Sequence, residues 1–148
     1  MPSQTNKKTI LITGAAGSIG KYLRDGFQDR YNLKLTDIKA EEGADIIIAD
    51  LRKIDDMMNI TRNVDVVIHL AAHPGDRDSH TQLLPDNIEG TYNVFEACRQ
   101  NHVERIVYAS TNHVIDGYAK DRYVTADMAI RPDSMYAVSK QFGESLGC

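Results

Sequence analysis

Short apolar runs alternate with longer amphipathic stretches along this chain. Runs of strand length, either continuously apolar or alternating with polar residues, predict strands at about 8–13, 31–37, 44–49, 64–70 and 105–109. Apolar side chains at helical spacing predict helices from about residue 18, at 53–61 and at 86–101, and a last helix that begins near 132–134. Strands that alternate with helices indicate an α/β fold, a doubly wound parallel sheet of about five strands with helices on both faces.

The helical spacing also predicts which side chains face the sheet. We expect inward faces formed by Ile19, Leu23 and Phe27, by Ile54, Met57 and Met58, and by Ile88, Tyr92, Phe95 and Cys98 or Arg99. Asp133 or Ser134 is the expected N-cap of the last helix. The stretch 111–133 carries no clear period and is expected to be largely irregular, which in a domain of this size usually has a functional reason.

Composition narrows the class of protein. The 148 residues, 42% hydrophobic and 26% charged, fit one globular domain, 1–148. A net charge of −4 without a basic block argues against a nucleic-acid partner, and no apolar run reaches the roughly 20 residues that span a bilayer, so we expect no membrane partner. The polar start favours the cytoplasm. Cys98 is expected in the core and Cys148 as an exposed thiol.

The first candidate site is the glycine-rich segment Gly14-Ala15-Ala16-Gly17-Ser18-Ile19-Gly20, between the first strand and the first helix. A dinucleotide site needs a tight turn, a close approach of the main chain to the pyrophosphate, and an open helix N-terminus. Gly14, Gly17 and Gly20 can meet these needs in that order, although their spacing is G-x-x-G-x-x-G and not the commoner G-x-G-x-x-G.

An acidic residue closes the second expected strand. Asp37 lies seventeen residues after Gly20, close to the roughly 20 expected for a carboxylate that binds the adenosine ribose. The same carboxylate would repel a 2′-phosphate, so the sequence favours NAD over NADP, although Lys39 weakens that preference.

The second candidate site is the pair Tyr136 and Lys140, which share one face of the last helix at i and i+4. A tyrosine with an ordinary pKa near 10 is a poor base at neutral pH, and a neighbouring ammonium favours the phenolate. Such a pair could remove the proton of an alcohol while a hydride leaves.

With these motifs the chain resembles the extended short-chain dehydrogenase/reductase family, in its epimerase/dehydratase branch. The resemblance follows the chain in order through Gly14 to Gly20, Asp50-Leu51, His69-Leu70-Ala71-Ala72, Asn87 with Gly90-Thr91, Ala109-Ser110-Thr111, and Tyr136 with Lys140. It implies a Rossmann fold, NAD as cofactor, and a sugar or nucleotide-sugar substrate. The cofactor contacts that it implies are Gly14, Gly17, Ser18, Ile19, Gly20, Asp37, Ile38, Asp50, Leu51, Leu70, Ala71, Ala72, Asn87, Tyr136 and Lys140.

The resemblance also assigns roles at the reacting end. Tyr136 is implied as the base, Lys140 as the partner of the nicotinamide ribose, and Thr111 or its neighbour Ser110 as the hydroxyl near the reacting oxygen. Substrate contacts are expected from His73, Ser110, Thr111 and Asn112, with His113 as a further candidate. His69, His73 and His80 lack the spacing and companions of a metal site, so none is expected.

A narrower resemblance concerns the substrate. The segment Ser110-Thr111-Asn112-His113-Val114 is similar to the S-S-N-H-x segment of uronate dehydrogenases, which oxidise the anomeric carbon of a uronate to a lactone. The alternatives that stay open are a nucleotide-sugar epimerase or dehydratase and a non-catalytic NAD-binding fragment. Because family members are about twice as long, we expect the C-terminal substrate-binding part to be absent, activity to be weak or lost, and an open edge at the fifth strand to favour a homo-oligomer.

Overall fold

A five-stranded parallel sheet forms the centre of the molecule in the computed structural model, which describes residues 7–75 and 79–147. The strands are β1 (Thr9–Thr13), β2 (Asn32–Asp37), β3 (Ile46–Ile48), β4 (Val66–His69) and β5 (Arg105–Tyr108). Their order is β3-β2-β1-β4-β5. From β1 the chain adds β2 and β3 on one side, and it then crosses over to add β4 and β5 on the other side of β1. This confirms the predicted doubly wound fold. In folds of this kind ligands bind at the carboxyl ends of the strands, beside the reversal in strand order.

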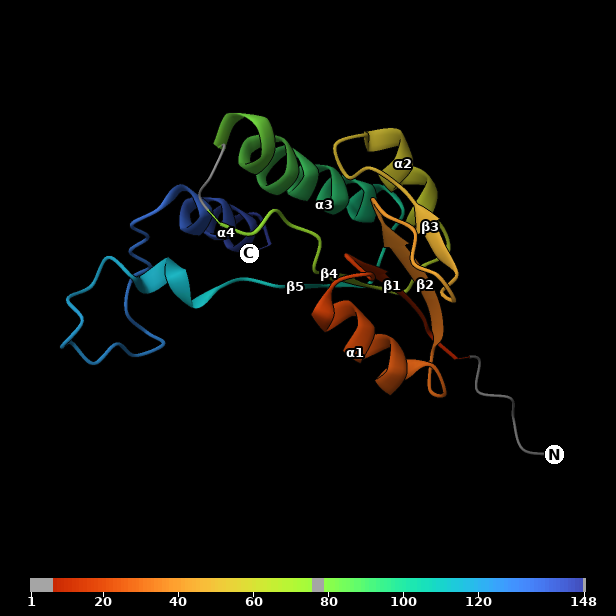
Figure 1. Cartoon of the computed structure of the whole chain (residues 1–148), viewed down its shortest axis with the longest axis horizontal. Coiled ribbons are helices and arrows are strands. Elements are labelled where there is room, and N and C mark those ends of the chain that lie inside the picture. Colours follow the sequence, from red (N-terminus) through yellow and green to blue (C-terminus); the bar gives the residue numbers. More distant parts are fainter. Residues whose placement is uncertain (1–6, 76–78, 148) are drawn as a thin grey trace.

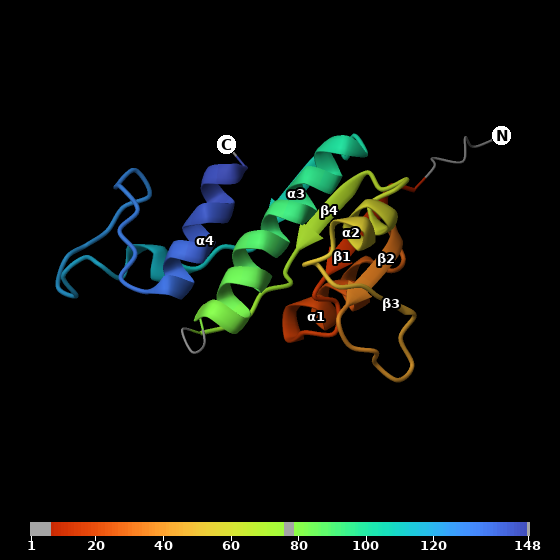
Figure 2. The same ribbon diagram turned by 90° about the horizontal axis from the view of Figure 1, so that it is seen from above.

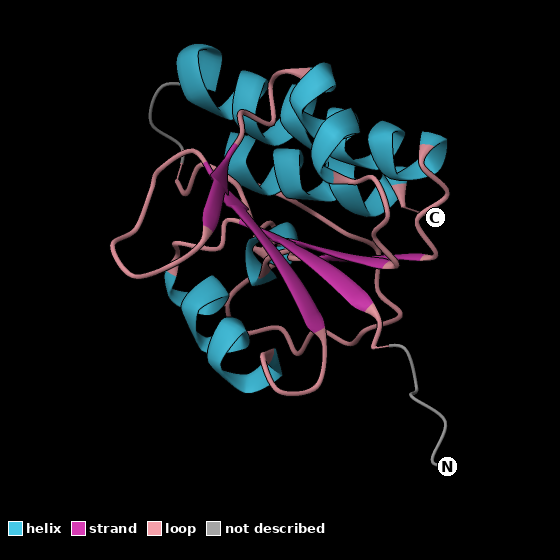
Figure 3. Cartoon of the chain, turned by 90° about the vertical axis from the view of Figure 1, so that its right-hand side faces the viewer, coloured by secondary structure: helices cyan, strands magenta, loops and turns pink. Residues whose placement is uncertain are grey.

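The helices cover the two faces of the sheet unequally. Helix α1 (Ser18–Phe27) lies alone on one face, while α2 (Ile54–Ile60), α3 (Gly90–Gln100) and α4 (Met135–Leu146) lie on the other (Figure 1 and Figure 3). Viewed from above, α3 and α4 run side by side, and α2 lies over the β3 side of the sheet (Figure 2). The sheet is therefore the middle of three layers.

Each face of the sheet carries its own apolar core because successive strand residues point to opposite faces. Under α2 and α3 lie buried side chains from β1, β4 and the two helices, among them Leu11, Val67, Met57, Val94 and Cys98. Under α1 lie Ile10, Ile12 and Ile68 together with the half-buried Leu23 and Phe27. The alternation Ile10-Leu11-Ile12 thus supplies both cores from one strand.

The long helix begins earlier than its pattern predicts. A π-helical segment, η1 (Ser79–Glu89), with Pro85 inside it, runs directly into α3, whereas the predicted helix begins near residue 86. A proline lacks the N–H that an α-helix needs and marks a break in the sequence pattern. The wider π geometry accommodates Pro85 and hides the helical period from a sequence-based prediction.

Three side chains predicted to face the sheet do not. Ile19 is 61% exposed at the first turn of α1, and Ile54 and Tyr92 are 37% and 50% exposed. The face of α3 that is buried consists instead of small and polar side chains, including Thr91, Asn93, Val94 and Ala97. The helix period was right, but the large apolar residues do not all lie on the buried stripe. Cys98 is buried as expected, and Cys148 lies outside the described residues.

The stretch between β5 and α4 is largely irregular, as predicted. It contains one short 3-10 helix, η2 (Asn112–Ile115), and then extends away from the sheet (Figure 1 and Figure 2). Ser134, and not Asp133, is the N-cap of α4, since its hydroxyl accepts a hydrogen bond from the Ala137 N–H. Among the described residues, no helix is long and apolar enough to cross a membrane.

We expect Leu11→Ala to lower the free energy of unfolding by about 3 kcal/mol, because it leaves a cavity between β1 and the α2–α3 layer. Leu11 is fully buried, whereas Ile48 at the β3 edge is 56% exposed. Ile48→Ala is the control and should cost less than about 1 kcal/mol. Urea unfolding followed by circular dichroism measures both. Equal losses for the two variants would contradict the placement of Leu11 at the centre of the core.

Candidate functional site

The turn after β1 brings two segments of backbone closer together than any side chain would allow. Gly14 has a φ of +71°, and a Cβ built on it would lie 2.8 Å from the Ala71 nitrogen. A Cβ on Gly20 would lie 2.5 Å from the Gly14 carbonyl oxygen. Gly14 is therefore required by the contact of this turn with the chain after β4, and Gly20 by the contact of the same turn with the start of α1.

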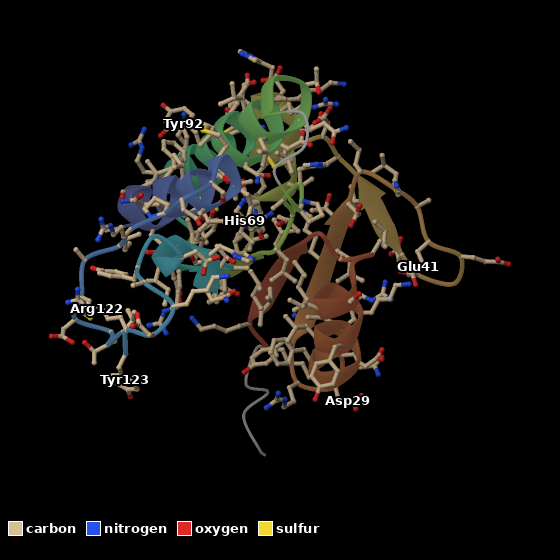
Figure 4. All side chains as sticks on the ribbon, turned by 60° about the vertical axis from the view of Figure 1, so that its left-hand side comes forward. Asp29, Glu41, His69, Tyr92, Arg122 and Tyr123 are labelled. Carbon is tan, nitrogen blue, oxygen red and sulfur yellow. The ribbon has the colours of Figure 1, made fainter. Side chains whose placement is uncertain are left out.

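A buried threonine and histidine hold this contact together. The Thr13 hydroxyl accepts hydrogen bonds from the N–H groups of Leu70 and Ala71, both at 3.2 Å, and lies 2.7 Å from His69 Nδ1. Because the hydroxyl has one proton and already accepts twice, it donates to Nδ1, and the proton of His69 is on Nε2, 3.4 Å from the Thr91 hydroxyl. Burial, helped by the charge of Lys140, lowers the pKa of His69 to about 3, so the ring is neutral. His69 lies in the interior of the molecule (Figure 4).

A cleft of about 460 Å³ runs along the carboxyl ends of β1, β2 and β4. The structure brings most of the expected cofactor residues to this cleft, which is lined by Gly14, Gly17, Asp37, Ile38, Asp50, Leu51, Leu70, Ala71 and Ala72. Its walls combine apolar segments, in which the main chain is close to the surface, with the three carboxylates of Asp37, Asp50 and Asp86. An elongated polar ligand with an apolar ring fits such a lining.

The start of α1 is open to an anion beside this cleft. Gly17 is the N-cap and provides no side-chain hydrogen bond, and no acidic residue stands in the first turn. The first N–H groups of α1, from Ser18 and Ile19 onward, therefore have no capping side chain. The exposed Ile19 side chain stands at the same end of the helix, away from the core in which its spacing placed it. A pyrophosphate is the kind of group that such an N-terminus binds.

Asp37 is held in place by the glycine turn itself. Its carboxylate accepts hydrogen bonds from the Ala16 N–H at 3.0 Å and from the Lys39 N–H at 3.3 Å. The turn and the acid at the end of β2 are thus one unit, and the carboxylate faces the cleft from a fixed position. A ribose with two free hydroxyls matches an oriented carboxylate of this kind.

Asp50, at the far side of the cleft, is paired within the chain. Arg52 binds its carboxylate with two nitrogens, Nε at 2.9 Å and Nη2 at 2.7 Å, and this pair lowers the pKa of Asp50. Asp86 lies 3.9 Å from the Arg52 Nε, and its pKa is raised by burial. Both carboxylates line the cleft.

Asn87 connects the loop that borders the first cleft with α4. Its amide accepts from the His73 N–H at 2.7 Å and donates to the His73 carbonyl and to the Ser139 hydroxyl. The Ser139 hydroxyl in turn donates to the carbonyl of Tyr136. Both amide protons of this buried side chain therefore bind protein atoms. A direct contact of Asn87 with a cofactor stays a prediction. The role that the structure shows is to hold the loop at His73 close to α4.

Lys140 lies buried beneath Tyr136. Its ammonium donates to the Ala109 carbonyl at 2.9 Å and lies 5.1 Å and 5.9 Å from the ring centroids of Tyr108 and Tyr136. Burial lowers the pKa of Lys140 to about 8. The helix thus holds a cation close below the tyrosine, as the i, i+4 spacing predicts, and the aromatic faces on both sides stabilise it.

Tyr136 opens into a second cleft of about 490 Å³, whose lining also includes Thr111 and His113. Pro74 lines both clefts, so the two are adjacent. The His113 ring packs edge-on against Tyr136 with centroids 6.0 Å apart. A ligand that extends along the first cleft would therefore end beside Tyr136.

The remaining expected substrate residues separate in space. Ser110 donates to the carboxylate of Glu144 and lines a third cleft, between α3, α4 and β5, so it does not share a cleft with Tyr136. Thr111 does share it, and its hydroxyl accepts from the His113 N–H. Asn112 is exposed at the start of η2, and His73 belongs to the cofactor cleft.

Several lining residues were not among the site residues expected from the sequence. Pro74 and Asp86 also line the first cleft, together with Lys39, which the sequence connected only with the cofactor preference. Asp116 also lines the second cleft, together with Asp133 and Ser134, which the sequence named only as candidate N-caps. Asp86 adjoins Asn87, and Ser134 caps the helix that carries Tyr136. Their closeness in sequence to these motifs could have identified both as candidate site residues. Asp116 had no such signal, because it lies in the irregular stretch. Among residues 7–75 and 79–147, no group of three His, Cys, Asp or Glu side chains could hold a metal ion.

The sheet order, the glycine turn and the first cleft together define a dinucleotide-binding α/β domain. Residues 10–147 match the model of the NAD dependent epimerase/dehydratase family, so this chain belongs to that family.

Individual relatives agree with this assignment. The chain is 36% identical to L-arabinose 1-dehydrogenase (NAD(P)(+)) of Haloferax volcanii, over 93% of this chain and 59% of the relative. The structure of uronate dehydrogenase from Agrobacterium tumefaciens superposes with a TM-score of 0.87 at 34% identity, over 94% of this chain and 54% of that one. The structure of MoeE5 in complex with UDP-glucose and NAD superposes with a TM-score of 0.82 at 34% identity, over 94% and 48%. The chain thus spans about half the length of the relatives that it matches.

The burial of Lys140 should make stability depend on pH. Because its pKa is about 8 in the folded chain, the unfolded chain, with an ordinary lysine pKa near 10.4, binds more protons between those values. The free energy of unfolding of the wild type should therefore rise with pH across this window relative to Lys140→Met, by about 3 kcal/mol. Urea unfolding of both proteins at pH 7 to 10.5 measures it. Parallel pH profiles would contradict a desolvated ammonium at this position.

Proposed function

We propose that residues 1–148 form an NAD-binding domain of a sugar dehydrogenase in which Tyr136 acts as the base. The observation that carries the proposal is that the two clefts are adjacent and share Pro74. The glycine turn borders the first cleft, and Tyr136, above the buried Lys140, borders the second. In the NAD-dependent family to which the chain belongs, bound NAD supplies the hydride acceptor. A cofactor that fills the first cleft would bring its reactive ring to the tyrosine.

The cofactor contacts follow from the lining of the first cleft. The N–H groups at the start of α1 would bind the pyrophosphate, and the carboxylate of Asp37 would accept the hydroxyls of the adenosine ribose. Asp50 and Leu51 would border the adenine, and Leu70, Ala71 and Ala72 would support the cofactor from the β4 side. The fixed Asp37 carboxylate supports NAD over NADP, and Lys39 in the same lining weakens that preference.

The chemistry assigned to the second cleft is proton removal from an alcohol. The Lys140 ammonium would favour the phenolate form of Tyr136, and this phenolate would take the proton of the substrate hydroxyl and become the neutral hydroxyl. Thr111 would bind the reacting oxygen. Lys140 would also reach the nicotinamide ribose from beneath. Thr111 is preferred over Ser110 because it lines the cleft of Tyr136 while Ser110 binds Glu144.

The relatives named above differ in the sugar on which they act, namely L-arabinose and a uronate, and one neighbour binds UDP-glucose. We therefore propose a sugar hydroxyl as the site of hydride loss. A nucleotide-sugar epimerase or dehydratase is the second candidate, supported by the family description and the UDP-glucose complex. Net accumulation of NADH distinguishes the two, because an epimerase returns the hydride. A homo-oligomeric state and a cytoplasmic location stay predictions.

The NAD site is tested by isothermal titration of the chain with NAD and NADP. We expect Asp37→Asn to weaken NAD binding about tenfold and to reduce the preference over NADP, because the ribose hydroxyls lose a charged acceptor. Asp29→Asn, in the exposed turn after α1, is the matched control and should leave both affinities unchanged. A folded wild-type chain that does not bind NAD would refute the proposal.

Turnover by the 148-residue chain should be low. Because the chain spans about half the length of its relatives, we expect the substrate to be poorly positioned and the rate with NAD and glucose or glucuronate to stay below about 1 s⁻¹. Tyr136→Phe should abolish the remaining NADH formation while it changes the NAD affinity less than about threefold. Full retention of the rate in Tyr136→Phe would exclude this tyrosine as the base.

A further inference from the structure

The second cleft carries an acidic lining that bears on the charge of the substrate. Around Tyr136 and Thr111 the described lining consists of Pro74, Gly75, His113, Asp116, Asp133 and Ser134. Two of these side chains are carboxylates, and none is a lysine or an arginine. The inference drawn from this lining rests on the proposed function, since it concerns the sugar that the same cleft would take.

Asp116 is fixed near the reacting end by His113. The His113 Nδ1 donates to the Asp116 Oδ2 at 2.5 Å, and the two side chains are 51% and 40% exposed. His113 in turn packs edge-on against the Tyr136 ring. With His113 neutral the pair carries one negative charge. With His113 protonated, the part of the lining that the structure describes is still net negative through Asp133.

The nearby cations of the described chain are directed elsewhere. The Lys140 ammonium lies beneath Tyr136, only 4% of the residue is exposed, and it donates to the Ala109 carbonyl. The guanidinium groups of Arg122 and Arg131 lie over the Tyr118 ring, at 5.2 Å and 5.5 Å from its centroid. Neither arginine lines the cleft.

We propose that this cleft selects a neutral aldose over a uronate, and that Asp116 is a specificity-determining residue. A carboxylate accepts strong hydrogen bonds from sugar hydroxyls, whereas it repels the carboxylate of a uronate. Specificity then arises as much from the group that is rejected as from the group that is bound. The His113–Asp116 pair supplies this repulsion at a fixed place beside Tyr136.

The proposal is tested by a saturation-transfer NMR titration of the NADH-loaded chain with glucose and with glucuronate, which differ only at C6. NADH prevents turnover during the titration. We expect glucose to bind at least about fivefold more tightly at low salt, and the ratio to shrink as salt screens the charges.

Asp116→Asn should reduce the ratio of the two affinities to about twofold or less, because it removes the charge and keeps the size of the side chain. Asp121→Asn makes the same change in the exposed loop outside the cleft lining and should leave the ratio unchanged. If the substitution disturbed the fold of the cleft, it would weaken the binding of both sugars equally. A change in the ratio of the two affinities therefore reports the effect of the Asp116 charge.

Equal or tighter binding of glucuronate by the wild type would overturn the proposal. So would a ratio that Asp116→Asn and Asp121→Asn shift alike, or a failure of both sugars to bind. A failure of the proposed function would be seen in a separate titration with NADH. In that case the folded chain would not bind NADH. The sugar preference measured without NADH then still reports on the acidic lining.

Discussion

The close contact between the turn after β1 and the chain after β4 is the constraint on which the rest of the site depends. Gly14, with its positive φ and no room for a Cβ, allows the approach, and the Thr13 hydroxyl secures it through the N–H groups of Leu70 and Ala71. Thr13 in turn donates to a neutral, buried His69. Because Thr13 and His69 are both buried, a hydrogen bond lost between them would leave polar atoms unpaired, and this cost favours one arrangement of the junction.

This junction places the two clefts relative to each other. The β4 loop leaves Ala71 and reaches His73, where Asn87 binds its main chain on both sides and then binds Ser139 on α4. These hydrogen bonds hold the helix that carries Tyr136 and Lys140 against the same loop that borders the first cleft. The burial of Lys140 has a cost in solvation, but it keeps the ammonium under the tyrosine and out of the lining of the second cleft.

Local patterns were enough for the elements and for the cofactor side of the site. The alternation of apolar runs and amphipathic stretches identified all five strands, and the glycine motif with Asp37 identified the cleft, because these features depend on neighbours close in sequence. Prediction failed where distant segments decide. Ile19 lies at a helical spacing that suggests burial, yet it stands at a helix end beyond the sheet. Pro85 hid the true start of the long helical segment.

By itself, the sequence determined the doubly wound fold, the dinucleotide cradle and the Tyr136–Lys140 pair, since each follows from periodicity or fixed spacing along the chain. Only the tertiary structure decided that Ser110 and Thr111, adjacent in sequence, lie in different clefts, and that Asn87 binds protein on both sides. It also decided that Asp116, in a stretch without any pattern, pairs with His113 and lines the same cleft as Tyr136. Charges and hydrogen bonds act over a few ångströms in space, and the sequence does not record which distant residues come that close.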